Sequence, residues 1–199
     1  MSTSGTSDTE FRRVVRFVVL LNLAYFGVEF AVALVIGSVS LFADSIDFLE
    51  DASLNVLILI GLSWPAPRRK TLGKVLAGIL LIPALATVWT AAQKLAVPVA
   101  PAPMPLTLTG AGALIVNFTC ALMLARYRHH GGSLSLAAFL SARNDVLANV
   151  AIVAAGLITA YTLSLWPDLI VGLGIAIINA DAAREVYQAA QNERDVAVP

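Results

Sequence analysis

Six apolar runs constrain the fold of this 199-residue chain more than any other feature of its sequence. Each run has about 20 residues or more, which is enough for a helix to cross the hydrocarbon core of a bilayer. Residues that end helices separate the runs, among them Gly37, Pro65 and Pro167. The sequence therefore predicts membrane-spanning helices at residues 11–36, 38–64, 72–95, 106–127, 134–163 and 167–187.

The overall composition agrees with a single membrane domain. Hydrophobic residues make up 58% of the chain and charged residues 13%, which is too apolar for a soluble domain. We therefore expect an all-α membrane protein, a six-transmembrane-helix bundle over residues 11–188, with polar tails at residues 1–10 and 189–199. Because the net charge is zero and the basic residues do not follow a helix face, we expect the lipid bilayer and no nucleic acid as a partner.

The basic residues between the runs predict the orientation of the helices. Three arginines lie at the start of the first run, a basic cluster at residues 68–70 follows the second, and Arg126 and Arg128 lie at the end of the fourth. The connections on the other side contain only Lys94. By the positive-inside tendency, both termini are expected in the cytoplasm. We therefore predict a multi-pass integral membrane protein of the bacterial plasma (inner) membrane.

Four carboxylates interrupt the second apolar run, with no lysine or arginine beside them. They are Asp44, Asp47, Glu50 and Asp51, and Asn55 follows one turn later. A charge at the centre of a membrane helix costs roughly 2.5–3.5 kcal/mol on insertion scales, so the cluster predicts a functional site. At about 100° per residue, the aspartates and the asparagine fall within a sector of roughly 80° on one helix face. Such a face can bind a cation.

The fifth apolar run repeats part of this pattern. Asp51 and Asn55 correspond to Asp145 and Asn149, and a valine and an isoleucine follow at matching offsets. Counting about 1.5 Å per residue, both aspartates lie roughly 15–20 Å from the same membrane surface. We therefore expect the two carboxylates to face each other near the middle of the bilayer.

Extended by one helical turn, the repeat pairs Asp47 and Asp51 with Ser141 and Asp145. A spacing of four places both side chains of each pair on one face, so two packed helices present four oxygen-bearing groups to a common point. These are hard ligands, which favour ions such as Mn²⁺ or Mg²⁺ over zinc. We predict that these four residues bind a divalent metal. Further candidates for the same site are Asp44, Asn144 and Glu50.

Several other polar residues are expected to support this site. Asn22, Tyr25 and Glu29 share one face of the first predicted helix, and with Asn55 and Asn149 they are candidates for lining the ion pathway.

Two asparagines in other helices, Asn117 and Asn179, are expected to form interhelical hydrogen bonds. Arg143 projects from the face of its helix opposite Asp145, so we expect it to pair with Glu50 or Asp44.

Buried carboxylates also couple metal binding to protons. Carboxylates crowded into a cavity of low dielectric constant repel one another, and burial favours their neutral forms. An entering metal ion must therefore displace protons, which is the physical basis of a metal/proton antiporter. Rocking of the helices about a midplane site would supply alternating access. The expected partners are a divalent cation and protons, and no bound cofactor is expected.

Two segments resemble a known family, the cation diffusion facilitators or cation efflux proteins. Residues 37–51 (GSVSLFADSIDFLED) are similar to the second helix of that family, and residues 141–149 (SARNDVLAN) to its fifth. The resemblance covers residues 11–188 and implies a short form that lacks the C-terminal cytoplasmic domain. It also implies a homodimer that exports divalent transition metals, such as Mn, Fe, Co or Zn, in exchange for protons. The tetrahedral midplane site of the family would correspond to Asp47, Asp51, Ser141 and Asp145.

Two alternative functions compete with transport, one because the sequence differs from the family at residue 141, and one because another class of membrane protein also has facing aspartates. Ser141 stands where the family commonly has His or Asp, which favours a second reading as a transport-inactive homologue that acts as a membrane scaffold or partner subunit. Intramembrane aspartyl proteases also place one Asp on each of two facing helices, but within Tyr-Asp and Gly-x-Gly-Asp motifs. Here Gly172-Leu-Gly174 is followed by Ile175. We therefore expect a transporter and not an enzyme.

Overall fold

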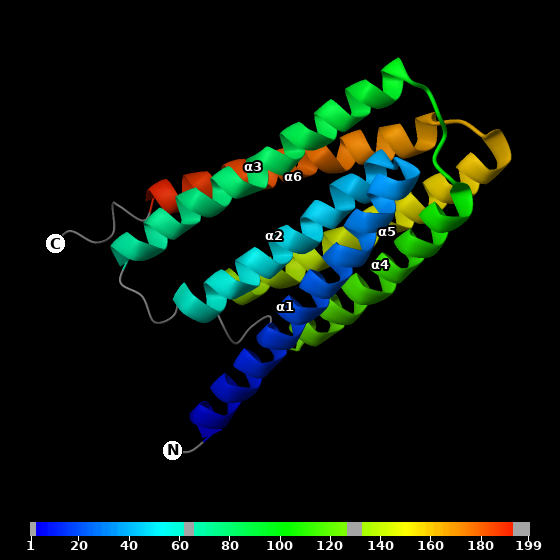
Figure 1. The fold of residues 1–199 in the computed structure, drawn as a ribbon. Coiled ribbons are helices and arrows are strands. Elements are labelled where there is room, and N and C mark those ends of the chain that lie inside the picture. The colour runs from blue at the N-terminus through cyan, green and yellow to red at the C-terminus, as the bar shows by residue number, and fades with distance from the viewer. Residues whose placement is uncertain (1–2, 62–65, 127–132, 193–199) are drawn as a thin grey trace.

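The structure is a computed structural model that describes residues 3–61, 66–126 and 133–192. These residues form six α-helices, and they contain no β-strand. Figure 1 shows the helices as one elongated bundle, with α1 beginning and α6 ending at the same end. The helices are α1 (Thr3–Ile36), α2 (Val39–Gly61), α3 (Ala66–Ala96), α4 (Pro103–Ala125), α5 (Ser133–Thr162) and α6 (Trp166–Asn192). The predicted all-α bundle is confirmed, with each apolar run forming one helix.

The ends of the helices differ from the prediction in an informative way. Helix α1 begins at Thr3, so it includes most of the polar segment predicted as a tail. Helix α3 begins at Ala66 and α4 at Pro103, so prolines that were expected to separate helices instead lie in their first turns. Proline is tolerated there because the first backbone N–H groups of a helix have no partner within it. Of the C-terminal tail, residues 189–192 continue α6, and residues 193–199 lie outside the described part.

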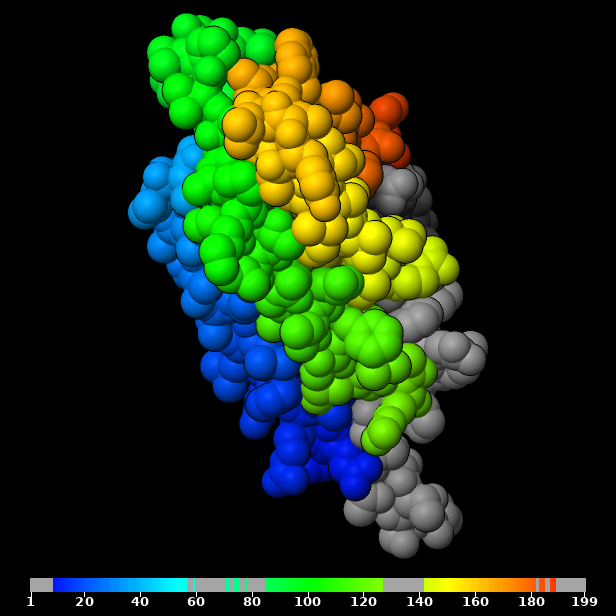
Figure 2. All heavy atoms as spheres, turned by 90° about the vertical axis from the view of Figure 1, so that its right-hand side faces the viewer, coloured from blue at the N-terminus to red at the C-terminus, as the bar shows by residue number. Residues whose placement is uncertain are grey.

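Helix α2 lies at the centre of the bundle. It contacts all five other helices, whereas α1 packs mainly on α2 and α4, and α3 packs mainly on α6 (Figure 1). Figure 2 shows α4 and α5 packed side by side on one face of the molecule, which agrees with their extensive contact. Because α2 is surrounded by other helices, its polar side chains are separated from lipid by protein.

The outer surface of the bundle is apolar, as expected for a protein within a bilayer. Large hydrophobic side chains such as Leu20, Val35 and Ile115 are exposed on it. Among the described residues, three helical segments are long and apolar enough to cross a membrane, namely residues 9–36, 103–125 and 142–162. Helix α2 is distinguished from these segments by its four acidic residues, which are turned into the bundle.

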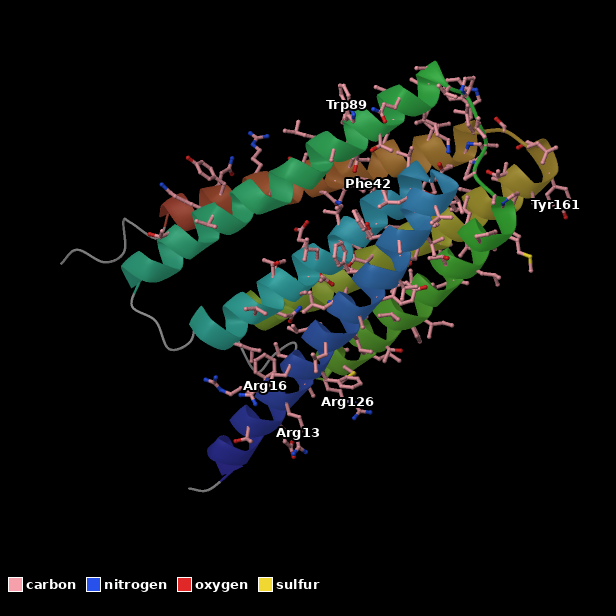
Figure 3. All side chains as sticks on the ribbon, viewed as in Figure 1. Arg13, Arg16, Phe42, Trp89, Arg126 and Tyr161 are labelled. Carbon is pink, nitrogen blue, oxygen red and sulfur yellow. The ribbon has the colours of Figure 1, made fainter. Side chains whose placement is uncertain are left out.

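The two ends of the bundle differ in their charge. Figure 3 shows Arg13, Arg16 and Arg126 at the end where α1 begins and α4 ends, and Tyr161 at the opposite end. We call the first the terminal end and the second the Gly37 end, after the residue that joins α1 to α2. The arginines at the terminal end agree with the charge asymmetry from which the orientation was predicted.

The turn between α1 and α2 fixes the start of the central helix. Gly37 adopts φ +63°, a left-handed conformation that favours glycine, and the N–H of Ser38 donates to the carbonyl of Ala33 at 3.0 Å. This bond is typical of the motif that closes helix C-termini. The hydroxyl of Ser38 then accepts the N–H of Leu41 at 3.1 Å, which caps the start of α2. The chain thus reverses direction within two residues.

A buried carboxylate from another helix completes this cap. Asp168, in the first turn of α6, accepts the backbone N–H groups of Val39 at 2.9 Å and Ser40 at 3.1 Å. It also accepts the hydroxyls of Ser38 and Ser40, both at 2.6 Å. Lys94 of α3 lies 3.9 Å from the same carboxylate and donates to the carbonyl of Gly37. The carboxylate therefore ties the Gly37 ends of α2, α3 and α6 together. We call these contacts the Asp168 clamp.

Close packing of backbones accompanies the Asp168 clamp. A Cβ atom placed on Gly172, one turn further along α6, would lie 2.6 Å from the carbonyl carbon of Val39 and 2.7 Å from the nitrogen of Ser40. Only glycine therefore permits this approach of α6 to the beginning of α2.

Candidate cation site

The four carboxylates of α2 are all enclosed by the bundle. Asp44 is fully buried, and Asp47, Glu50 and Asp51 are 7%, 7% and 4% exposed. Their burial follows from the central position of α2, which turns every face of the helix toward protein. Charged groups in such surroundings require partners that offset their loss of hydration.

Asp51 of α2 lies opposite Asp145 of α5. Their side chains are within hydrogen-bonding range of each other, and Asp145 is partly buried. The structure thus brings together the two aspartates that the internal repeat of the sequence paired.

The internal repeat between α2 and α5 also appears in the hydrogen bonds of its two asparagines. The amide of Asn55 donates to the carbonyl of Asp51 at 2.8 Å, and the amide of Asn149 donates to the carbonyl of Asp145 at the same distance. Each asparagine is buried and lies one turn toward its helix's C-terminus. These bonds turn each amide back along its own helix, beside the aspartate of the repeat.

Asp47 lies one turn before Asp51, and the amide of Asn179 in α6 lies within hydrogen-bonding range of its carboxylate. This contact between α2 and α6 agrees with the expectation that Asn179 interacts across helices. Ser141 lies in α5 one turn before Asp145, but its side chain lies outside the described residues. Among the side chains that are described, no three His, Cys, Asp or Glu residues converge in the way a metal ion requires.

Asp44 belongs to a different set of contacts. It accepts a hydrogen bond from the amide of Asn149 at 3.0 Å, and its carboxyl group lies within hydrogen-bonding range of Glu29 in α1. Glu29 and Asn149 are both fully buried. The first, second and fifth helices therefore meet at Asp44.

The polar side chains of α1 are directed into the bundle at three levels. Buried Asn22 accepts a long hydrogen bond from the thiol of Cys120 at 3.7 Å. Tyr25 donates to the carbonyl of Thr109 at 2.7 Å, and its ring packs against Phe48 with centroids 5.2 Å apart. The third level is Glu29. Of the three predicted pathway groups in α1, two thus contact α4, and Glu29 is the one that contacts an acidic residue of α2.

Two neighbouring residues of α5 lie apart from the carboxylates: Asn144, a candidate for the cation site, and Arg143, the expected partner of an acid in α2. Asn144 is exposed, and its side-chain oxygen accepts a hydrogen bond from Arg143 at 3.4 Å. Arg143 is also exposed, so the expected ion pair with Glu50 or Asp44 is wrong. A buried ion pair is favourable only if the attraction between its charges exceeds the cost of removing both from water.

The sequence did not single out Asp168, although its carboxylate accepts four hydrogen bonds. An available signal was its position directly after Pro167, where an acidic residue in a first helical turn interacts favourably with the helix dipole. Its second role, at the start of α2, depends on which helices are neighbours and has no signal in the sequence.

Comparison with known proteins agrees with these features. The family model described as the cation efflux transmembrane domain matches residues 15–190, which is most of the chain. A search of curated protein sequences gave no match. The matched region includes all the buried carboxylates of α2 and the aspartate of α5 that faces them. The chain is an integral membrane protein and belongs to the cation efflux family of metal cation transporters.

Proposed function

We propose that the protein exports divalent metal cations from the cytoplasm in exchange for protons, at a centre formed by Asp47 and Asp51 of α2 and Ser141 and Asp145 of α5. The observation that carries the proposal is the approach of buried Asp51 to Asp145 across two helices. The proposal includes a homodimer in the bacterial plasma membrane, as the family resemblance implies.

The chemistry of the donors supports a hard divalent cargo. Three carboxylates and a hydroxyl offer only oxygen, which suits ions such as Mn²⁺ better than ions that prefer imidazole or thiolate ligands. The amide donors nearby, Asn179 and Asn149, are uncharged. They can orient carboxylates without cancelling their negative charge, so the attraction for a cation is preserved.

Proton exchange follows from the same burial. Two carboxylates as close as Asp51 and Asp145 repel each other when both are ionised, and a proton or a metal ion can relieve that repulsion. Metal ligands must be deprotonated, so binding of one cation opposes binding of the other. A site that alternates between the two faces of the membrane would then exchange metal for protons.

Transport in proteoliposomes tests this function. Purified protein is expected to drive uptake of Mn²⁺, Co²⁺ or Zn²⁺ that depends on an imposed pH gradient. Asp51→Asn and Asp145→Asn remove one charge each at nearly constant volume and are expected to abolish uptake. Asp181→Asn is the matched control, because it makes the same change at an exposed position in α6.

The outcomes separate the competing explanations. Full uptake by both aspartate variants would exclude the α2–α5 centre while leaving transport in place. If the parent protein takes up none of these ions under any pH gradient, the chain is better described as a membrane scaffold or partner subunit.

A further inference from the structure

Glu29 is a buried carboxylate of α1 whose polar neighbour is another acid, Asp44. It lies in the middle of α1, fully buried, and neither carboxylate oxygen has a hydrogen-bond donor in the described structure. Its neighbour is another acid, Asp44, whose second oxygen also has no donor. Within the described part of the chain, the only salt bridge is Lys94 with Asp168, so no basic side chain pairs with this couple.

The amide of Asn149 provides an independent observation at the same place. Its nitrogen donates to Asp44, and this orientation leaves its side-chain oxygen without a partner and fully buried. Buried polar atoms in proteins almost always have a partner. Here the three side chains that meet at Asp44, two acids and one amide from three helices, each carry an unpartnered oxygen.

These residues form a level distinct from the α2–α5 centre. Asp44 precedes Asp47 in α2, and Asn149 follows Asp145 in the antiparallel α5. Both steps, about 4.5 and 6 Å at 1.5 Å per residue, lead toward the Gly37 end. Glu29 of α1 joins this level through its contact with Asp44. The bundle therefore contains an inner level around Asp51 and Asp145 and an outer level around Glu29 and Asp44.

We propose that Glu29, Asp44 and Asn149 form a second binding site, which takes a hard divalent metal ion. All the available donors are carboxylate or amide oxygens, the ligand set of such ions. A bound cation would partner the orphaned oxygens and offset the charge of two acids that have no base. The proposal rests on the proposed function in one respect, that the ion is the same cargo as at the inner level.

A second site at this depth gives the cargo an intermediate position between the inner level and the Gly37 end. An ion that leaves the α2–α5 centre past Asp47 would reach Asp44 about one helical turn further along α2, so carboxylates are available at each step. Two acceptor levels thus divide the loss of ligands into smaller steps.

Counting bound Mn²⁺ on the full-length protein tests the proposal. The signal of free Mn²⁺ in electron paramagnetic resonance disappears on binding, so titration gives the number of ions per chain. The double variant Glu29→Gln with Asp44→Asn is expected to lose one ion per chain. Asp51→Asn with Asp145→Asn is expected to lose the other. Glu10→Gln is the control, since it removes an exposed carboxylate of α1.

The ion that each double variant retains also reports that the variant is folded. The second site is excluded if the Glu29 and Asp44 variant binds as many ions as the parent, which is the result expected if the pair holds only protons. If Glu29 and Asp44 substitutions remove an ion but Asp51 and Asp145 substitutions remove none, the second site stands and the proposed α2–α5 centre fails.

Discussion

At the scale of single residues, the acids of α2 are distinguished by the kind of partner each one has. Asp44 accepts a hydrogen bond from an asparagine and Asp47 lies within range of another, whereas Asp168, outside the cluster, is paired with a lysine. An amide satisfies one lone pair and leaves the negative charge intact, but an ammonium group cancels it. The difference separates acids that remain able to attract a cation from an acid that serves the fold.

Residue 141 is predicted to set the choice of metal. A hydroxyl is a hard ligand, whereas the neutral nitrogen of imidazole suits zinc. Ser141→His is therefore expected to strengthen binding of Zn²⁺ relative to Mn²⁺ by about tenfold or more, which corresponds to about 1.4 kcal/mol or more. Isothermal titration of the parent and the variant with both metals measures this ratio.

The control for this prediction keeps the residue polar. Ser141→Thr retains the hydroxyl and should leave the ratio of the two affinities near that of the parent. If Ser141→His also leaves it unchanged, residue 141 is not a ligand of the transported ion.

At this scale the sequence predicted contacts within a repeat better than contacts between unlike helices. Asp51 and Asp145 were paired by matching offsets, and the structure places them together. The contact of Glu29 with Asp44 was not predicted, because it depends on how α1 is rotated about its axis. Arg143 was assigned to the interior for its charge alone, but the structure places it on the outside of the bundle.

At the scale of helices, the Asp168 clamp joins the N-termini of two of them. Asp168 lies in the first turn of α6, and its carboxylate accepts N–H groups from the first turn of α2. Helix N-termini carry partial positive charge, so one carboxylate stabilises both. Because α2 carries the acidic residues, the clamp also fixes their depth and rotation relative to α6, including the contact of Asp47 with Asn179.

Loss of the Asp168 clamp is predicted to destabilise the protein strongly. Asp168→Ala removes the acceptor of four buried donors and leaves Lys94 without its partner. Breaking a buried charge pair costs roughly 3–5 kcal/mol, so unfolding in detergent is expected at a clearly lower temperature or denaturant concentration. Asp168→Asn keeps one acceptor oxygen and should be affected less.

Asp181→Ala supplies the comparison, because Asp181 is an exposed acid of the same helix. Surface substitutions of that kind usually change stability by about 0.5 kcal/mol or less. If Asp168→Ala behaves like this control, the contacts of the clamp do not stabilise the fold.

The length of the apolar runs predicted the helices, but it predicted their ends less well. The polar start of α1 is helical although it contributes nothing to a span. Pro67 and Pro103 lie in the first turns of α3 and α4 and not in the connections between helices. Hydropathy detects the part of a helix that lies in lipid, because only that part must be apolar. It carries no information about where the helix continues into water.

At the scale of the whole molecule, the position of α2 explains why four acids can be tolerated in one membrane helix. Helix α2 touches every other helix, so its acids face protein on all sides. The sequence indicated that α2 and α5 face each other, but it did not indicate that α2 is central. That arrangement results from packing among six helices with similar apolar surfaces, which hydropathy does not distinguish.

The same enclosure predicts that metal binding by the whole protein releases protons. Ions that enter a cavity of crowded carboxylates replace protons there, so affinity for Mn²⁺ is expected to rise with pH. Each proton released per ion changes the affinity about tenfold per pH unit, or about 1.4 kcal/mol.

Titration calorimetry in two buffers with different heats of ionisation counts the protons directly. The Asp51→Asn variant should release fewer than the parent, whereas Asp181→Asn should match it. Binding with no proton release in either buffer would show that the metal enters an already ionised site, and exchange against protons could not then originate at these carboxylates.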